Sequence, residues 1–164
     1  MAAETVPVSQ QSDGQLRIWF VPTGSNALSA AIINGGTSKA LTYSLTSDGF
    51  NYGITQAEVE DKRLTLVQDL SQPGRKKETL EVKYVDSTDS ASADVILTEN
   101  LTGQLVIRRG ISNATNAAVG DKIDVITFKA GAKRHDPPTE NGVDTVTQTL
   151  YITAVTQTDA TVVA

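Results

Sequence analysis

Residue types that catalyse reactions are sparse in this sequence. Histidine occurs once, as His135, between Arg134 and Asp136 in a polar stretch, and there is no cysteine. A Ser-His-Asp triad needs a second group that orients the imidazole, and a zinc site needs several ligands together. We therefore interpret His135 as a solvated loop residue, not as a catalyst or a metal ligand.

Paired carboxylates are the next chemistry to consider. They occur at Glu58, Glu60 and Asp61, and again at Glu78 and Glu81. Glycosidases hold two carboxyl groups at a set separation across a cleft. Nothing in the sequence indicates such a cleft, and acidic residues mostly lie on protein surfaces. We predict that the chain is not an enzyme and that it uses no cofactor.

Basic side chains occur in three short groups, Arg75–Lys77, Arg108–Arg109 and Lys133–Arg134. The groups are scattered and few aromatic residues accompany them, whereas binders of single-stranded nucleic acid combine a basic groove with aromatic platforms. The net charge of −5 also argues against tight phosphate binding. It permits a surface along which DNA slides without sticking. Solvated strand ends are one interpretation of the basic groups, and salt bridges between subunits are the other.

Composition predicts one small β-rich domain. The 164 residues fit a single domain, and aromatic residues make up only 5% of them, so Val, Ile, Leu and Ala must form most of the core. The abundant Thr and Val are β-branched and favour strands. The apolar runs are far shorter than the roughly 20 residues of a membrane span. The first residues lack the charged and apolar regions of a signal peptide, so we expect synthesis in the cytoplasm.

Alternating residues and turn signals predict the strands. The predicted strands cover residues 15–21, 41–45, 64–70, 78–85, 104–109, 122–129 and 145–155, with a last edge segment at 159–164. Strands 64–70 and 78–85 are expected to form a hairpin. Pro73-Gly74 would close it, because Pro fixes φ at the first corner of a turn and Gly permits positive φ at the second. Asp48-Gly49 predicts a further turn.

One short helix is predicted to begin after Ser90 or Ser92, since either is a suitable N-cap, and to end near Glu99. Residues 27–33 fit either a helical turn or a strand. Residues 1–13 lack periodicity and are expected to form an arm that precedes a single domain at 14–164. The predicted fold class is therefore mainly β, an antiparallel β-sandwich or barrel with one short flanking α-helix.

A series of motifs runs in a fixed order through the chain: Leu45–Asn51, Val59–Leu64, Gln72–Arg75, Thr79–Val85, Gln104–Gly110, Val125–Ala132, Lys133-Arg134, Pro137-Pro138 and Thr147–Ile152. Their order resembles that of the tail tube proteins of siphophages that infect actinobacteria, and the resemblance covers roughly residues 14–155. The resemblance implies hexameric rings whose inner strands join into one barrel. The rings stack into a tube through which double-stranded DNA leaves.

The resemblance also implies where the protein acts and what it meets. It implies a protein of the virion tail, made in the cytoplasm of the bacterial host. Its expected partners are further copies of itself and the tail tip, tape measure and tail terminator proteins, with no role for a membrane.

Without an active site, the functional residues are expected to be assembly contacts. The strand pairs 64–70 with 78–85 and 122–129 with 145–155 are the candidates for the wall of the lumen, because closing a sheet between subunits satisfies its open edges. Loops 46–63, 71–77 and 130–144, with the arm, are expected to join subunits or rings. The candidate contact residues are Asp48, Phe50, Tyr52, Arg75, Lys76, Lys133, Arg134, Pro137 and Pro138.

Two other functions remain open at this point. One is the inner-tube subunit of a contractile injection system, which belongs to the same structural class. The other is an Ig-like surface or carbohydrate-binding module. Such modules usually display aromatic platforms, and Trp19 is the single tryptophan in this chain.

Overall fold

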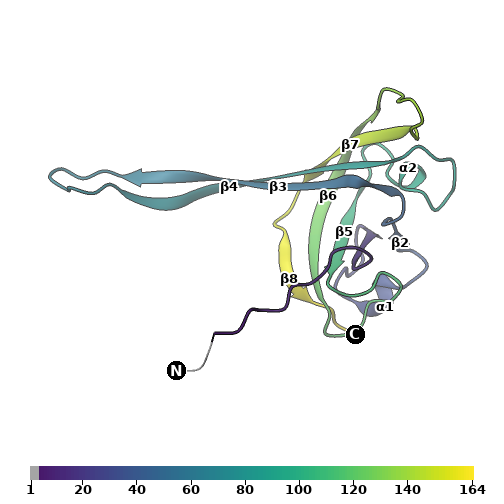
Figure 1. Cartoon of the computed structure of the whole chain (residues 1–164), viewed down its shortest axis with the longest axis horizontal. Helices are drawn as coiled ribbons and strands as arrows, with labels where there is room; N and C mark the ends of the chain where they lie inside the picture. Colours follow the sequence, from purple (N-terminus) through teal and green to yellow (C-terminus); the bar gives the residue numbers. More distant parts are fainter. Residues whose placement is uncertain (1–3) are drawn as a thin grey trace.

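The computed structural model describes residues 4–164 as one strongly curved antiparallel sheet, an open half-barrel (Figure 1). Its strands are β1 (Leu16–Pro22), β2 (Lys39–Ala40), β3 (Leu45–Asp61), β4 (Leu70–Val85), β5 (Thr102–Arg109), β6 (Lys122–His135), β7 (Thr145–Ile152) and β8 (Gln157–Thr161). The strand order is β2-β1-β5-β6-β7-β4-β3, and β8 pairs with β6 beside β7. The prediction of a mainly β, antiparallel fold is confirmed.

The main core covers one face of the whole sheet. Every second residue of a strand points to this face, as the period of a strand requires. The helix α2 (Ala93–Ile96) and the residue Leu41 close the core from the other side. Its buried members are Ile18, Phe20, Leu41, Leu80, Val82, Tyr84, Ala93, Leu97, Leu105, Ile107, Ile126, Phe128, Ala130, Val146 and Leu150.

A second, smaller core covers only part of the opposite face, over β1, β5 and the start of β6. The helix α1 (Ala30–Ile33) and the C-terminal segment lie on it. Its buried members are Trp19, Val21, Ala27, Ile33, Val106, Ala117, Ile123, Val125 and Val162. The opposite face is therefore covered near one end of the sheet and open near the other.

The side chain of Arg108 is fully buried at the border of the second core. Its guanidinium donates to carbonyl oxygens of the loop 112–116 and to the Asp121 carboxylate, 3.0 Å away. It also lies over the Trp19 ring, 5.3 Å from the centroid. A single buried cation thus satisfies the backbone of a loop that carries little apolar packing of its own.

The hairpin of β3 and β4 differs from the prediction. Residues 64–70 are not a strand but the tip of the hairpin, and β3 pairs with β4 from Asp61↔Leu70 inwards. The predicted turn at Pro73-Gly74 is wrong. Those residues lie inside β4, where the register shifts opposite Ala57. A side chain at position 74 would meet the Ala57 carbonyl at 2.9 Å, so the glycine permits a bulge, and proline is tolerated because only one side of β4 is paired there.

The predicted strand at 41–45 and the turn at Asp48-Gly49 are also wrong. Residues 42–44 form a turn, and β3 runs straight through Gly49 with a register shift between Leu45 and Phe50. Polar residues and glycine at a bulge give the same sequence signal as a turn, because both need an irregular backbone.

Gly49 permits a close contact between two strands, and its replacement by alanine is expected to destabilise the fold. A Cβ atom there would lie 2.1 Å from the Lys83 carbonyl oxygen, so the backbone must move. We expect Gly49→Ala to lower the free energy of unfolding by roughly 1–3 kcal/mol, measured by urea denaturation. Gly36→Ala is the control, because no atom lies within 4 Å of its Cβ position. Equal effects of the two substitutions would contradict the prediction.

The remaining elements follow the sequence signals closely. Ser92 caps α2 as expected, its hydroxyl accepting from the Val95 amide at 3.3 Å, but the helix ends at Ile96, before Glu99. Residues 30–33 form the helical alternative of the ambiguous 27–33 segment. The strands predicted near 15–21, 104–109, 122–129 and 145–155 are confirmed, and the last edge segment is β8, slightly earlier than expected.

Candidate assembly surfaces

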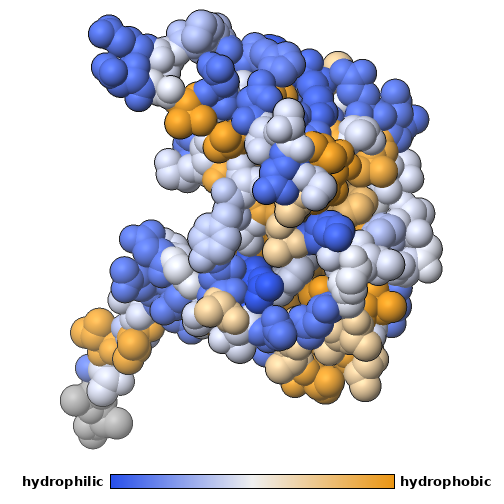
Figure 2. All heavy atoms as spheres, turned by 90° about the vertical axis from the view of Figure 1, so that its right-hand side faces the viewer, coloured by the Kyte–Doolittle hydropathy of each residue, from blue (hydrophilic) through white to orange (hydrophobic). Residues whose placement is uncertain are grey.

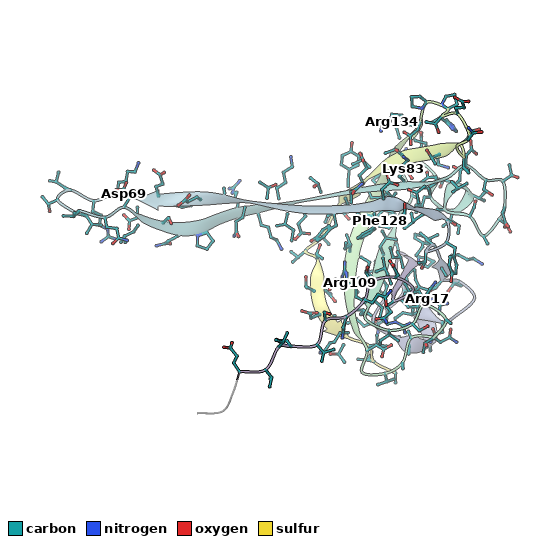
Figure 3. The ribbon with its side chains drawn as sticks, viewed as in Figure 1. Arg17, Asp69, Lys83, Arg109, Phe128 and Arg134 are labelled. Carbon is teal, nitrogen blue, oxygen red and sulfur yellow. The ribbon has the colours of Figure 1, made fainter. Side chains whose placement is uncertain are left out.

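The β3–β4 hairpin projects far from the body of the molecule (Figure 1). β4 pairs with β7 only from Leu80 to Val85, so from position 79 outwards its one neighbour is β3. Figure 3 shows Asp69 at the far end of the hairpin and Lys83 where β4 joins the body. The projecting part is a two-stranded ribbon, and such a ribbon is marginally stable alone and gains by packing against a partner.

The hairpin carries several exposed hydrophobic side chains. Leu64 and Val67 at the tip are almost completely exposed. The others are Ile54, Val59, Leu66 and Leu70. Large apolar side chains gathered on a projecting element favour an interaction surface over a solvated loop.

A polar face lies open across β6, β7, β4 and β3, on the side away from the main core. The strand register places Lys129 beside Tyr151, and Glu81 beside both Thr149 and Asn51. All five side chains are exposed, and Thr79 extends the row. The α1 layer that covers β1, β5 and the start of β6 does not reach β7, β4 or β3. We call this the open face. It is rich in hydroxyls and nearly balanced in charge.

The two borders of the sheet differ. At β1, the border is closed by the two residues of β2 and by Thr42, whose hydroxyl accepts from the Ile18 amide at 2.9 Å. At the other border, β3 has β4 on one side and no strand on the other within residues 4–164. An unpaired strand of this length is a template for pairing with another chain unless it is covered.

Polar contacts fix the root of the hairpin to the body. Glu78 is almost buried, binds the Lys76 ammonium at 2.5 Å and accepts a hydrogen bond from Thr156 in the β7–β8 connection. Tyr52 packs beside it against the main core. The hydrogen bond from Lys76, and then that from Thr156, lowers the pKa of the Glu78 carboxyl. The contacts join the projecting ribbon to the body at a defined place.

The lowered pKa of Glu78 predicts a pH-dependent contribution to stability. A carboxyl whose pKa is lower in the folded state stabilises the fold above its ordinary pKa of 4.5, and the contribution is lost as the pH falls through the folded value. Glu78→Gln should therefore destabilise the protein at pH 7 and much less near pH 3. Chemical denaturation of both proteins across this range tests it; a difference that does not change with pH would contradict the assignment.

A second group of charges lies where β6 ends. The Lys133 ammonium binds the Asp94 carboxylate at 2.7 Å and so ties β6 to α2. Arg134 is mostly exposed and lies 3.7 Å from Asp136. The Thr147 hydroxyl is the main cause that lowers the pKa of Asp136. The loop that follows, with Pro137 and Pro138, is exposed.

The predicted contact residues therefore fall in two regions and do not form one site. Phe50 and Tyr52 lie at the hairpin root, half-buried against the main core, and Asp48 is exposed nearby. Arg75 and Lys76 lie on the projecting ribbon, whereas Lys133, Arg134, Pro137 and Pro138 lie at the end of β6 and beyond. Two of the expected contact loops, 46–63 and 71–77, are mostly strand. Sequence reasoning missed the exposed tip, because its alternation was assigned to a strand.

Comparison with known proteins identifies the family to which this chain belongs. Residues 3–164 match the family of phage tail tube proteins. The chain belongs to that family. A tail tube protein is a structural component of the phage tail, so this chain is not an enzyme. The resemblance drawn from the motif order is confirmed at this level.

A solved structure gives independent support for the fold. A chain of the anti-feeding prophage (AFP) baseplate, determined by cryo-EM with sixfold symmetry applied, superimposes with a TM-score of 0.57 at 10% identity. The match covers 94% of this tail tube protein and 96% of that chain. At this identity the likeness concerns the fold alone. No curated protein matches the sequence.

Other kinds of site find no support in the described part of the chain. Within residues 4–164, no group of three or more His, Cys, Asp or Glu side chains is placed to hold a metal ion. Nor does any helix there have the length and hydrophobicity needed to cross a bilayer.

Proposed function

We propose that this tail tube protein assembles into hexameric rings that stack into the tube of a long, non-contractile phage tail, through which double-stranded DNA passes into the host. The observation that carries the proposal is the open face, a polar sheet surface with the main core directly behind it. In the ring, this face lines the bore. The tube meets the tape measure protein inside and the tail tip and tail terminator proteins at its ends.

The chemistry of the open face suits passage of DNA. Its exposed side chains are mostly hydroxyls and amides, and the charges of Glu81 and Lys129 offset one another. A basic bore would hold the phosphates, whereas a neutral to negative one lets DNA move. The sequence predicted that strands 64–70 and 78–85 line the lumen. In the structure β4 pairs with β3 instead, so the proposed wall of the lumen uses β3 and β4.

The unpaired border of the sheet at β3 suits closure into a ring. Each subunit leaves the outer side of β3 free, and pairing or packing against a neighbour covers it. The exposed apolar tip of the hairpin then packs on an adjacent subunit or ring. The resemblance in motif order favours a phage of actinobacteria as part of this proposal.

Electron microscopy tests the proposal. Concentrated purified protein, viewed in negative stain, should show hollow discs that stack into tubes. Monodisperse single subunits under conditions that favour assembly, together with the absence of this polypeptide from isolated phage tails, would contradict it.

Two alternatives make different predictions. The inner tube of a contractile system would have a sheath gene beside this one. A carbohydrate-binding module is less well supported, because Trp19 is only 2% exposed and cannot form a sugar platform.

A further inference from the structure

We propose that the N-terminal arm of one copy adds as a short strand to the outer edge of β4 in a neighbouring copy, along residues 75–79. The inference rests on the proposed function, because it needs copies placed side by side. It adds to that function the two surfaces that form one contact between neighbouring copies, namely the arm and the outer edge of β4.

The arm is built as a strand without a partner. Residues 4–11 have no regular secondary structure, and Val6 and Val8 are 93% and 96% exposed. Residues two apart point to the same side of an extended chain, so the two valines form one apolar face. Figure 2 shows the arm, which ends in the grey atoms, standing away from the body with hydrophobic side chains on it.

Pro7 restricts how the arm can pair. It has no backbone N–H and lies between the two valines, whose N–H and C=O groups point to the opposite side of the chain from its own. The arm can therefore form backbone hydrogen bonds through Val6 and Val8. The edge that carries Pro7 lacks an N–H donor at that position and is poorly suited to pairing. Proline is typical of edge strands for this reason, so the arm suits a last strand added to an existing edge.

The outer edge of β4 offers a matching site. Its backbone at 75–79 is paired with β3 on one side only. Beside it lies a notch lined by Lys76, Lys77 and Glu78 on the hairpin and by residues 152–155 on the body. The exposed Val155 and the half-buried Ile152 give the notch apolar surface for the two valines.

Charge selects this edge over the outer edge of β3. The arm carries Glu4 and Asp13 and no basic residue among positions 4–13. The β4 segment carries three basic residues in a row at 75–77, of which Lys76 is bound to Glu78. On β3, Glu60 and Asp61 are bound to Lys62 and Arg63, and Glu58 adds a further negative charge. Arg75 and Lys77 therefore favour pairing of the acidic arm with β4, and Glu58 disfavours its pairing with β3.

The geometry of the arm favours a second copy as its partner. The Gln15 amide donates to the Ser12 carbonyl, which forms a turn at Gly14 beside β1. From there the arm leaves the body on a course separate from the hairpin (Figure 1). Within one subunit, the arm does not pair with the outer edge of β4. When the arm of one copy adds to the β4 edge of another, the backbone groups of both become hydrogen-bonded.

Two single-cysteine proteins test the contact, because the natural chain has no cysteine. Val8→Cys and Lys76→Cys proteins are mixed, assembled into tubes and treated with a short bismaleimide. The expected product is a cross-linked heterodimer, absent when Val119→Cys, at another exposed position, replaces Lys76→Cys. Tubes without this product would overturn the inference, as would an intrachain cross-link in dilute protein that carries both cysteines.

Charge exchange gives a second measurement. Glu4→Lys with Asp13→Lys should slow tube growth roughly 5- to 30-fold, as expected for two exposed ion pairs. Adding Arg75→Glu and Lys77→Glu should restore growth in part. Growth unaffected by the first pair, or further slowed by the second, would overturn the inference. If the unmodified protein forms no tubes at all, the proposed function fails instead.

Discussion

Replacing residues 56–76 by an Asn-Gly turn is expected to yield a folded subunit that no longer forms tubes. The replaced segment lies beyond the last contacts of the hairpin with the body, at Tyr52 and Glu78. The main core and the pairing of β4 with β7 stay intact, so far-UV circular dichroism and cooperative unfolding should be preserved. Asn-Gly suits the tight turn that rejoins Thr55 with Lys77.

The loss of assembly follows from what the projecting ribbon exposes. It contains both the apolar tip and the 75–76 part of the proposed docking edge, and neither is needed by the isolated subunit. Size-exclusion chromatography and negative-stain microscopy would measure the result. A milder variant, Leu64→Ser with Val67→Ser, keeps the ribbon and removes the apolar tip, so it should weaken assembly without changing stability. Normal tubes from the shortened protein would show that the hairpin is not an assembly element.

Arg108→Ala is expected to cause a large loss of stability. The side chain is fully buried, and its removal would take the guanidinium donors away from the Asp121 carboxylate and from several carbonyl oxygens of the loop 112–116. Breaking a buried ion pair by removing one partner costs roughly 3–5 kcal/mol. Urea denaturation should show a lower midpoint with a similar slope, and amide exchange should be fastest in the loop 112–116.

The neighbouring arginine provides the matched control. Arg109 is about half exposed and binds Asp124, so Arg109→Ala should cost about 1 kcal/mol or less. Arg108→Lys separates charge from shape, because an ammonium cannot reproduce the several donors of a guanidinium. It should fall between alanine and the natural residue. Equal effects at positions 108 and 109 would contradict the account of the loop.

Where alternation along a strand was regular, the sequence alone was enough to predict the fold. Leu16, Ile18 and Phe20 all enter the main core, and β6 pairs with β7 as expected. The signals at Pro73-Gly74 and Asp48-Gly49 were misread, because a bulge inside a long strand and a turn between two strands use the same residues. Only the partner strand, which is distant in sequence, distinguishes the two.

The exposed elements that we propose as assembly surfaces were predicted in part. The basic residues of the hairpin lie on an exposed element, as expected, but Lys133 binds Asp94 within the chain. The buried role of Arg108 had no sequence signal, because an arginine in an alternating strand looks the same whether loops cover that face or leave it open. The open face could not be predicted from the sequence either, because the layer formed by α1 determines which part of the sheet stays uncovered.

A cryo-EM map of tubes assembled from this protein tests the central claim most directly. The account predicts a bore lined by β3, β4, β6 and β7, with Glu81, Thr149 and Lys129 facing the lumen and the apolar core behind them. A bore lined by α1 and β1, or a strongly basic bore formed by other strands, would contradict it.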